Sequence, residues 1–291
     1  METEYYTLIT GAGEGFGKAI AIECARRKMN LVLISLPGPQ LINLACFIER
    51  NYNVKVISME TDLRSESNIH LLYENIKSLK IKIRYFVNNA GILSRGYFDE
   101  LETEYVLDQI KVNVLAPTLL TKLFLHDLKS NSPSGILNVS SMASFFYLPK
   151  KQVYGATKSY LLSFSRSLQR ELKKYKVSVS TVCPGGMNTS YQLIYQNRKG
   201  NWGSRLSIME PEDVARIAVD GMLKGKKLII PGFMNNFFMF LDKILPLFIN
   251  DMITEYFMNK GSSPEVKPIS VAQNIDSYPI KFKSDYQKEF A

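Results

Sequence analysis

A regular alternation of short apolar runs and longer stretches of helical period constrains the fold of this chain most strongly. Seven runs rich in β-branched and other apolar residues stand near 5–10, 30–35, 54–58, 84–88, 135–140, 177–182 and 227–231. Strands joined by long helical connections pair in parallel, because the helix carries the chain back to the starting edge of the sheet. We therefore predict an α/β fold, a Rossmann-like, doubly wound, seven-stranded parallel sheet in a single domain.

Length and composition set the domain boundary. The 291 residues are 46% hydrophobic, enough for one well-buried domain of about 250 residues followed by a tail. We place the folded domain, with a C-terminal amphipathic helix, at residues 1–260. From Gly261 the sequence becomes polar and proline-bearing, so we expect 261–291 to be a partly ordered tail.

The first apolar run leads directly into a glycine-rich turn and then a stretch of helical period, 18–28. A strand, a glycine turn and a helix N-terminus form a cradle for a diphosphate, because the backbone can approach closely and free N–H groups face the anion. The spacing is Thr-Gly-x-x-x-Gly-x-Gly and not G-x-G-x-x-G, since Phe16 stands where the third glycine of that fingerprint would be. The predicted cradle residues are Thr10, Gly11, Gly13, Gly15, Phe16 and Gly17.

A tyrosine and a lysine four residues apart, Tyr154 and Lys158, predict proton chemistry. At that spacing both side chains lie on one face of a helix. A phenol ionises near pH 10, so exchange of its proton near neutrality calls for a neighbouring cation, which Lys158 can supply. Ser141, thirteen residues before the tyrosine, follows an apolar run and can grip a carbonyl oxygen. Ser140 is the competing hydroxyl, and we interpret it as a strand-end residue.

These clusters, together with Asn88-Asn89-Ala90-Gly91, occur in an order that resembles the short-chain dehydrogenases/reductases of the Tyr-x-x-x-Lys type. The resemblance covers residues 5 to about 230. It implies hydride transfer with a nicotinamide cofactor and a catalytic tetrad of Asn113, Ser141, Tyr154 and Lys158. Besides the cradle, Tyr154 and Lys158, it implies cofactor contacts at Asp62, Leu63, Asn89, Ala90, Gly91, Pro184, Gly185 and Thr189.

The tetrad suggests a division of labour. In the reductive direction Ser141 and Tyr154 would hydrogen-bond the substrate carbonyl, and Tyr154 would deliver the proton. Lys158 would lower the pKa of the phenol and hold the nicotinamide ribose, while Asn113 would anchor a water that replaces the proton. Asp62 would contact the adenine amino group, with a plain strand-end turn as the alternative.

The end of the second strand bears on the cofactor. An acidic residue there binds the ribose diol of NAD, whereas a basic residue nearby accepts the phosphate of NADP. This chain has Ser35-Leu36-Pro37-Gly38, with no carboxylate and with a hydroxyl that could donate to a phosphate, although Leu36 replaces the usual arginine and Glu14 is acidic. The balance favours NADP(H) over NAD(H). We expect no metal, because the three cysteines have no paired spacing.

Aromatic and aliphatic residues after Thr189 predict an apolar small-molecule substrate, a carbonyl or alcohol. The steroid and 3-oxoacyl reductases are the members that the chain most resembles, through the strand at 29–35. Two alternatives stay open: a small polar or sugar carbonyl, and a non-catalytic NAD(P)-binding sensor or scaffold.

The net charge of +9 is scattered over most helices, so we expect no nucleic-acid partner. With no signal peptide and no 18-residue apolar span, we expect a cytoplasmic protein. An apolar stripe at helical spacing, which we expect to pack on the domain or on a second subunit of a homo-oligomer, has peripheral membrane contact or a lid as its alternative. It consists of Phe237, Phe238, Leu241, Ile244, Leu245 and Phe248.

Overall fold

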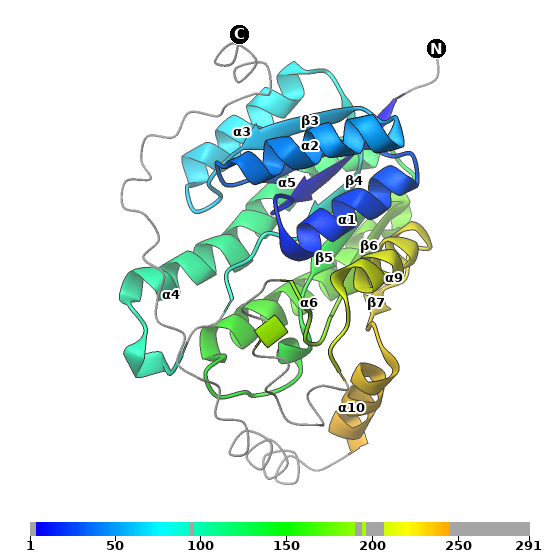
Figure 1. Cartoon of the computed structure of the whole chain (residues 1–291). Coiled ribbons are helices and arrows are strands. Elements are labelled where there is room, and N and C mark those ends of the chain that lie inside the picture. Colours follow the sequence, from blue (N-terminus) through cyan, green and yellow to red (C-terminus); the bar gives the residue numbers. More distant parts are fainter. Residues whose placement is uncertain (1–3, 94–95, 190–193, 196–206, 245–291) are drawn as a thin grey trace.

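The computed structural model describes residues 4–93, 96–189, 194–195 and 207–244. Its centre is one seven-stranded sheet in the order β3-β2-β1-β4-β5-β6-β7, in which every neighbouring pair is parallel (Figure 1). The predicted doubly wound fold is therefore confirmed. The strands are β1 (Tyr5–Thr10), β2 (Asn30–Ser35), β3 (Val56–Glu60), β4 (Lys82–Asn88), β5 (Ser134–Val139), β6 (Val177–Val182) and β7 (Leu228–Ile229).

Helices cover both faces of the sheet. One face carries α1 (Gly15–Arg26), α2 (Pro39–Tyr52) and α9 (Pro211–Leu223). The other carries α3 (Glu66–Ser78), α5 (Ala116–Ser130) and α6 (Gln152–Leu172). Helix α4 (Thr103–Ile110) packs on α6. The described residues also form α10 (Phe233–Ile244), the π-helical turn η2 (Lys111–Leu115), and the short helices η1 (Phe98–Glu100), η3 (Met142–Ser144) and η4 (Lys173–Tyr175).

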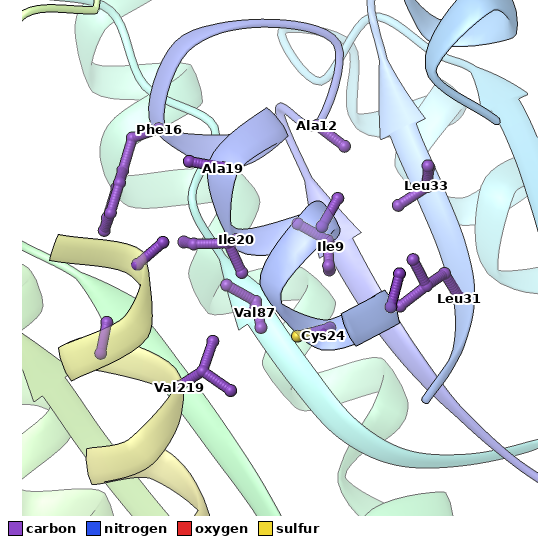
Figure 2. Close-up of a cluster of buried hydrophobic side chains, with 14 of the residues drawn as sticks. Ile9, Ala12, Phe16, Ala19, Ile20, Cys24, Leu31, Leu33, Val87 and Val219 are labelled. Carbon is purple, nitrogen blue, oxygen red and sulfur yellow. The ribbon is translucent and has the colours of Figure 1, made fainter. Parts of the chain in front are cut away.

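Two apolar cores flank the sheet, because successive strand residues point to opposite faces. In β1, Ile9 faces α1 and α9, whereas Leu8 faces α3 and α5. Figure 2 shows the first core, where Ile20 and Cys24 of α1 meet Val219 of α9 over the strands. A strand that is buried on both faces has a continuous apolar sequence instead of an alternating one. The apolar runs of this chain are continuous in this way.

The strand order reverses between β1 and β4, and this point positions the site. From β1 the chain winds outward through β2 and β3, and from β4 it winds the other way. Ile9 pairs in register with Val87, so the turn after β1 and the segment after β4 emerge side by side. In sheets of this kind, ligands bind in the crevice outside the carboxyl ends of the strands at such a point.

Element boundaries differ from the sequence prediction at a few places. β3 begins two residues later than predicted, and β7 contains only two residues. Helix α1 begins at Gly15, three residues before the predicted 18, because glycines in its first turn obscure the helical pattern. It ends at Arg26, just before Lys28 takes a positive φ of 62°.

Candidate active site

The glycine turn after β1 is built so tightly that side chains would collide in it. A Cβ on Gly17 would lie 2.0 Å from the carbonyl oxygen of Gly11, and one on Gly11 would lie 2.8 Å from the Cα atom of Ala90. Gly11 also has a φ of +64°, which disfavours other residues. The turn therefore needs its glycines in order to lie against the segment after β4.

The N-terminus of α1 opens toward the same crevice. Its N-cap residue, Glu14, makes no side-chain capping hydrogen bond, so no side chain of the cap satisfies the first N–H groups. Phe16 is buried in the first core and contributes only its backbone to the turn. Uncapped N–H groups and the positive end of the helix dipole suit an anionic group such as a diphosphate.

Thr10 and Asn89 fasten this turn to β4. The Thr10 hydroxyl accepts hydrogen bonds from the backbone N–H groups of Asn89 and Ala90, both at 3.1 Å. In return, Asn89 Nδ2 donates to the carbonyl oxygens of Thr10 and Gly11, both at 3.0 Å. These two side chains, predicted to bind the cofactor, thus shape its cradle by binding the chain itself.

Ser141, Tyr154 and Lys158 meet beyond the end of β5. Ser141 is the N-cap of η3, and its Oγ accepts from the backbone N–H of Ala143 at 3.1 Å, which leaves its own proton for another acceptor. The Ser141 hydroxyl is near enough to the Tyr154 phenol to lower the pKa of that phenol. Lys158 Nζ lies 5.7 Å from the centroid of the Tyr154 ring and donates to the Val139 carbonyl at 2.9 Å. The structure thus brings these three predicted residues together.

Ser140 lies beside the group and serves the backbone. It is buried, and its hydroxyl donates to the carbonyl oxygen of Lys158 at 2.8 Å. The interpretation of Ser140 as a strand-end residue agrees with this position.

Burial decides how the two proton-bearing groups titrate. It raises the pKa of the Tyr154 phenol, and the nearby Ser141 hydroxyl offsets part of that rise. It lowers the pKa of Lys158 to about 8. Lys158 Nζ donates to the Val139 carbonyl, and burial sets the direction of the shift of the phenol pKa, so the lowering of that pKa by Lys158 stays a prediction.

Asn113 sits in the π-helical turn η2 and is almost fully buried. Its Oδ1 accepts from the Ile92 N–H at 2.8 Å, while Nδ2 donates to the Ile92 carbonyl at 3.0 Å and to the Thr157 hydroxyl at 3.1 Å. Both amide hydrogens are thus used by the protein. If Asn113 anchors a water as predicted, it does so through atoms other than this NH₂ group.

The model of the family described as short chain dehydrogenase matches residues 6–198. The chain belongs to the short-chain dehydrogenase family. Human 17-beta-hydroxysteroid dehydrogenase type 3 is 32% identical over 188 residues, 64% of this chain and 60% of that protein, so the chain spans less than two thirds of that relative. The 3-oxoacyl-(acyl-carrier-protein) reductase of Aquifex aeolicus is 29% identical over 217 residues, 73% of this chain and 88% of that protein.

Among solved structures, a short-chain dehydrogenase from Sphingobium yanoikuyae in complex with NADPH is similar with a TM-score of 0.72 and 25% identity. The match covers 94% of this chain and 99% of that one. Membership in the family places the chain among the nicotinamide-dependent oxidoreductases. The described helices include none long and apolar enough to cross a membrane. Within the same residues, no group of three or more His, Cys, Asp or Glu side chains could hold a metal ion.

In this short-chain dehydrogenase, the end of β2 faces the glycine turn. A Cβ on Gly13 would lie 2.7 Å from Ser35 Oγ, so the hydroxyl borders the cradle as predicted for a cofactor contact. The carboxylate on the adjacent strand belongs to Glu60, which pairs with Ser35 in register. It is buried and accepts from the backbone N–H of Gly38 at 2.9 Å, so it braces the turn after β2.

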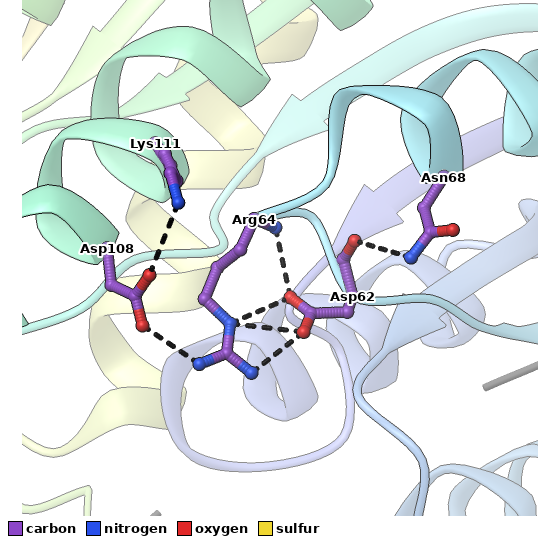
Figure 3. A network of polar contacts seen from close by, with 5 residues as sticks. All are labelled: Asp62, Arg64, Asn68, Asp108 and Lys111. Atoms are coloured by element: carbon purple, nitrogen blue, oxygen red, sulfur yellow. Dashed lines mark hydrogen bonds and ion pairs between the residues drawn. The ribbon is translucent and has the colours of Figure 1, made fainter. Parts of the chain in front are cut away.

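Asp62, the predicted adenine contact, is buried in a polar network that Figure 3 shows. Its carboxylate receives Arg64 through Nη2 at 2.7 Å and through Nε at 3.0 Å, and also the Arg64 backbone N–H at 2.9 Å. Arg64 Nη1 reaches on to Asp108 of α4 at 2.9 Å. The two carboxylates raise the pKa of Arg64. The network ties the end of β3, including buried Leu63, to the helix that leads into η2.

The segment after β6 closes the other side of the crevice. Thr189 lies next to the glycine turn, since a Cβ on Gly15 would be 3.3 Å from Thr189 Cβ. Pro184 is buried, and Gly185 lies against Asn235 of α10, whose Oδ1 would be only 2.5 Å from a Cβ at Gly185. Of the predicted substrate segment after Thr189, residues 190–193 and 196–206 lie outside the described residues, as does the tail at 261–291.

The apolar stripe divides in the structure. Phe237 and Ile244 are exposed, Phe238 and Leu241 are half-buried, and Leu245 and Phe248 lie outside the described residues. Met239 packs on Met142, Leu162 and Cys183. The exposed stripe residues share a face with Phe233 and Phe240, so packing on the domain accounts for only part of the expected stripe.

Three residues that position the site were missed by the sequence reading: Arg64, Thr157 and Asn235. Each is a common polar residue without a spacing that marks it. Asn235 is 2% exposed and is the polar residue that meets Gly185. Thr157 carried the one available signal, because it stands between Tyr154 and Lys158 on α6 and three residues after Tyr154, on the same side of the helix.

Proposed function

We propose that this protein transfers a hydride between a nicotinamide cofactor and the carbonyl or secondary alcohol group of an apolar substrate. The observation that carries the proposal is the convergence of Asn113, Ser141, Tyr154 and Lys158 beside the glycine cradle. A protein that only bound the cofactor would need the cradle, but it would not need a tyrosine beside a serine with a buried lysine one helical turn away.

The chain's own residues support catalysis in the reductive direction. Tyr154 holds its proton at neutral pH, as a general acid must, because burial raises its pKa. Ser141 carries one hydroxyl proton, which it can donate to a substrate carbonyl in place of the phenol while its oxygen accepts from Ala143. Below pH of about 8 Lys158 is an ammonium, which would stabilise the phenolate that remains once the proton has left.

The residues fit a dinucleotide. Gly11 and Gly17 let the turn lie close against the segment after β4, and the α1 N-terminus presents N–H groups that no side chain of its cap satisfies. The diphosphate would lie there, Lys158 would hold the nicotinamide ribose, and Thr189 would meet the carboxamide. The bound nicotinamide supplies or accepts the hydride.

We assign NADP(H) rather than NAD(H) as the preferred cofactor. The strand end carries Ser35, whose hydroxyl borders Gly13, and the adjacent carboxylate of Glu60 is already turned to Gly38. The carboxylate that would bind the ribose diol of NAD is therefore missing from the strand end, and the phosphate of NADP would not be repelled by one there. The similar Sphingobium yanoikuyae structure contains NADPH, which supports the same choice.

An apolar substrate, a steroid-like or 3-oxoacyl-like compound, is the substrate class we propose. The names of two relatives support it, a hydroxysteroid dehydrogenase and a 3-oxoacyl reductase. For partners we propose a homo-oligomer in a cytoplasmic setting, with contact to a membrane surface as the alternative use of the exposed face of α10.

The test is turnover of a panel of steroid, 3-oxoacyl, small polar and sugar ketones with NADPH and NADH, followed by the absorbance of the reduced nicotinamide. We expect the apolar ketones with NADPH to react fastest. Tyr154→Phe should lower kcat by about 100-fold or more, the usual contribution of a general acid, while fluorescence titration shows cofactor affinity within a few fold of wild type.

Tyr160→Phe is the matched control. Tyr160 lies on the same helix, is exposed, and its hydroxyl contacts Thr118 outside the site. It should leave kcat unchanged. Wild-type protein that binds NADPH tightly but reduces no ketone would support a sensor or scaffold instead, and Tyr154→Phe with near-normal turnover would refute the assigned acid.

A further inference from the structure

The hydroxyl of Thr157 lies between two residues of the proposed tetrad. It accepts from Asn113 Nδ2 at 3.1 Å and donates to the backbone carbonyl of Tyr154 at 2.8 Å. Thr157 is 4% exposed and Asn113 is 1% exposed, so water does not readily replace either bond. One side chain thus joins the π-helical turn η2 to the first turns of α6.

The direction of both bonds follows from the partners. The Ile92 N–H can only donate, so the amide oxygen of Asn113 must face it, and the Ile92 carbonyl fixes the amide nitrogen in turn. That nitrogen must then donate to Thr157. The Thr157 oxygen accepts this bond, and its single hydroxyl proton is donated to the Tyr154 carbonyl. No other arrangement of these four groups satisfies them all.

Asn113 is also linked to Lys158, through the backbone segment at Gly91 and Ile92. A Cβ on Gly91 would lie 3.2 Å from Asn113 Oδ1 and 3.3 Å from Lys158 Nζ, so the amide and the ammonium rest against the same backbone segment. Asn113 holds Ile92, the next residue of that segment, by both of its backbone groups. If the Asn113 amide turned, the segment beside Lys158 would lose its support.

From these contacts we infer that Thr157 is a positioning residue, which fixes the Asn113 amide and the Tyr154 helix turn relative to each other. This rests on the proposed hydride-transfer function. Thr157 touches neither the substrate nor the cofactor in this role. It acts through Asn113 and through the backbone of Tyr154, so its removal should change the rate of the proton step more than the binding of either ligand.

The test replaces the hydroxyl without changing the shape of the side chain. Thr157→Val should lower kcat at least tenfold, with the KM for ketone and the NADPH affinity from fluorescence titration within threefold of wild type. The pH above which kcat falls should also move, because the phenol and the lysine no longer keep their relative position. Thr157→Ser keeps the hydroxyl and should restore kcat to within twofold.

Thr118→Val is the matched control for the same chemical change. Thr118 also donates to a carbonyl of η2, that of Val114 at 2.7 Å, but its other neighbour is Tyr160 outside the site. This variant should keep the kcat and the pH profile of wild type. Equal losses in the Thr118 and Thr157 variants would show a general loosening of η2 and would overturn the inference.

A double-mutant cycle covers the case in which Thr157→Val folds poorly. Thr157→Ala should lower kcat less in the Asn113→Ala background than in the wild-type background, because the contact with Asn113 is already absent there and only the bond to the Tyr154 carbonyl is still lost. Additive effects, or kcat of Thr157→Val within twofold of wild type, would refute the positioning role. Absence of turnover in wild type itself would instead reject the proposed function.

Discussion

At the scale of single residues, Lys158 shows how burial and function oppose each other. It is 4% exposed, and its ammonium makes one hydrogen bond to a neutral carbonyl and no ion pair among the described contacts. An ammonium held in this way costs stability, because the backbone oxygen only partly replaces the lost hydration. The lowered pKa of about 8 expresses the same penalty.

This penalty predicts how stability changes with pH. Between the folded pKa of about 8 and the ordinary value of 10.5, the unfolded chain binds more protons than the folded one, so the free energy of unfolding rises with pH. The gain in the free energy of unfolding from the deprotonation of Lys158 is absent below that window and amounts to roughly 3 kcal/mol above it. Lys158→Met should lack this rise when urea unfolding is measured on both sides of the window.

Lys122→Met, at an exposed lysine of α5, controls for the loss of one positive charge. It should follow the wild-type curve. A constant difference between wild type and Lys158→Met across the whole window would contradict the buried ammonium.

Predictability from sequence varies among these residues for physical reasons. Ser141, Tyr154 and Lys158 could be predicted because their spacing along the chain and their chemistry both point to one task. Thr157 and Arg64 could not, because their roles depend on partners 44 residues away in the chain, Asn113 and Asp108 respectively. A hydroxyl before a lysine has many other uses, and only the fold selects among them.

At the scale of elements, strands and the glycine turn followed from local pattern, whereas η2 did not. Its sequence, Lys-Val-Asn-Val-Leu, contains neither glycine nor proline, the residues that usually signal a disturbed helix. Asn113 in the middle of the turn is held by Ile92 and Thr157, which lie 21 and 44 residues away in the chain. Pro117, which follows the turn, cannot donate a hydrogen bond to the Asn113 carbonyl four residues back. The π-turn therefore reflects this proline together with tertiary contacts, and a local pattern does not encode the tertiary contacts.

Helix α10 attaches to the site through one asparagine of a pair, and this gives a prediction. Asn235 Nδ2 donates to Pro231 O at 2.7 Å in a buried position, while the exposed Asn236 Nδ2 donates to Ile230 O and Gly232 O, both at 2.8 Å. Asn235→Ala should lower the free energy of unfolding by about 1–3 kcal/mol, because it leaves a buried carbonyl unpaired and a void at Gly185. Asn236→Ala should cost clearly less, since water can take over its bonds.

Thermal unfolding of the two variants, followed by circular dichroism, measures the difference. Equal melting temperatures would mean that α10 is not held against the segment after β6 by Asn235. A larger loss in Asn236→Ala would assign the attachment to the wrong residue of the pair.

At the scale of the whole molecule, the fold explains why one end carries the function. All parallel strands end at the same edge, so the turn after β1, the segment after β4, Ser141 after β5 and Pro184 after β6 gather there although they are far apart in sequence. This gathering could be predicted from the strand pattern alone. The surface that α10 presents at the same end could not, because apolar spacing does not say which part of an apolar face stays uncovered.

That surface carries the last prediction. Phe233, Phe237, Phe240 and Ile244 recur at helical spacing and are 83%, 43%, 57% and 61% exposed. A contiguous exposed apolar face of this kind is more often a binding surface than a surface that stays in contact with water. If a second subunit covers it, Phe237→Asp with Phe240→Asp should reduce the sedimenting mass, because charge repels across the contact, and neither protein should pellet with vesicles.

If the face binds a lipid bilayer instead, the opposite results are expected, because the net charge of the chain is positive. A protein of net charge +9 that inserted these side chains would pellet with anionic vesicles, less so as salt rises, and the double variant would lose pelleting without a change in mass. We expect the subunit result. Analytical ultracentrifugation beside vesicle co-sedimentation separates the two, and a variant of unchanged mass that no longer pellets would replace the oligomer with a membrane contact.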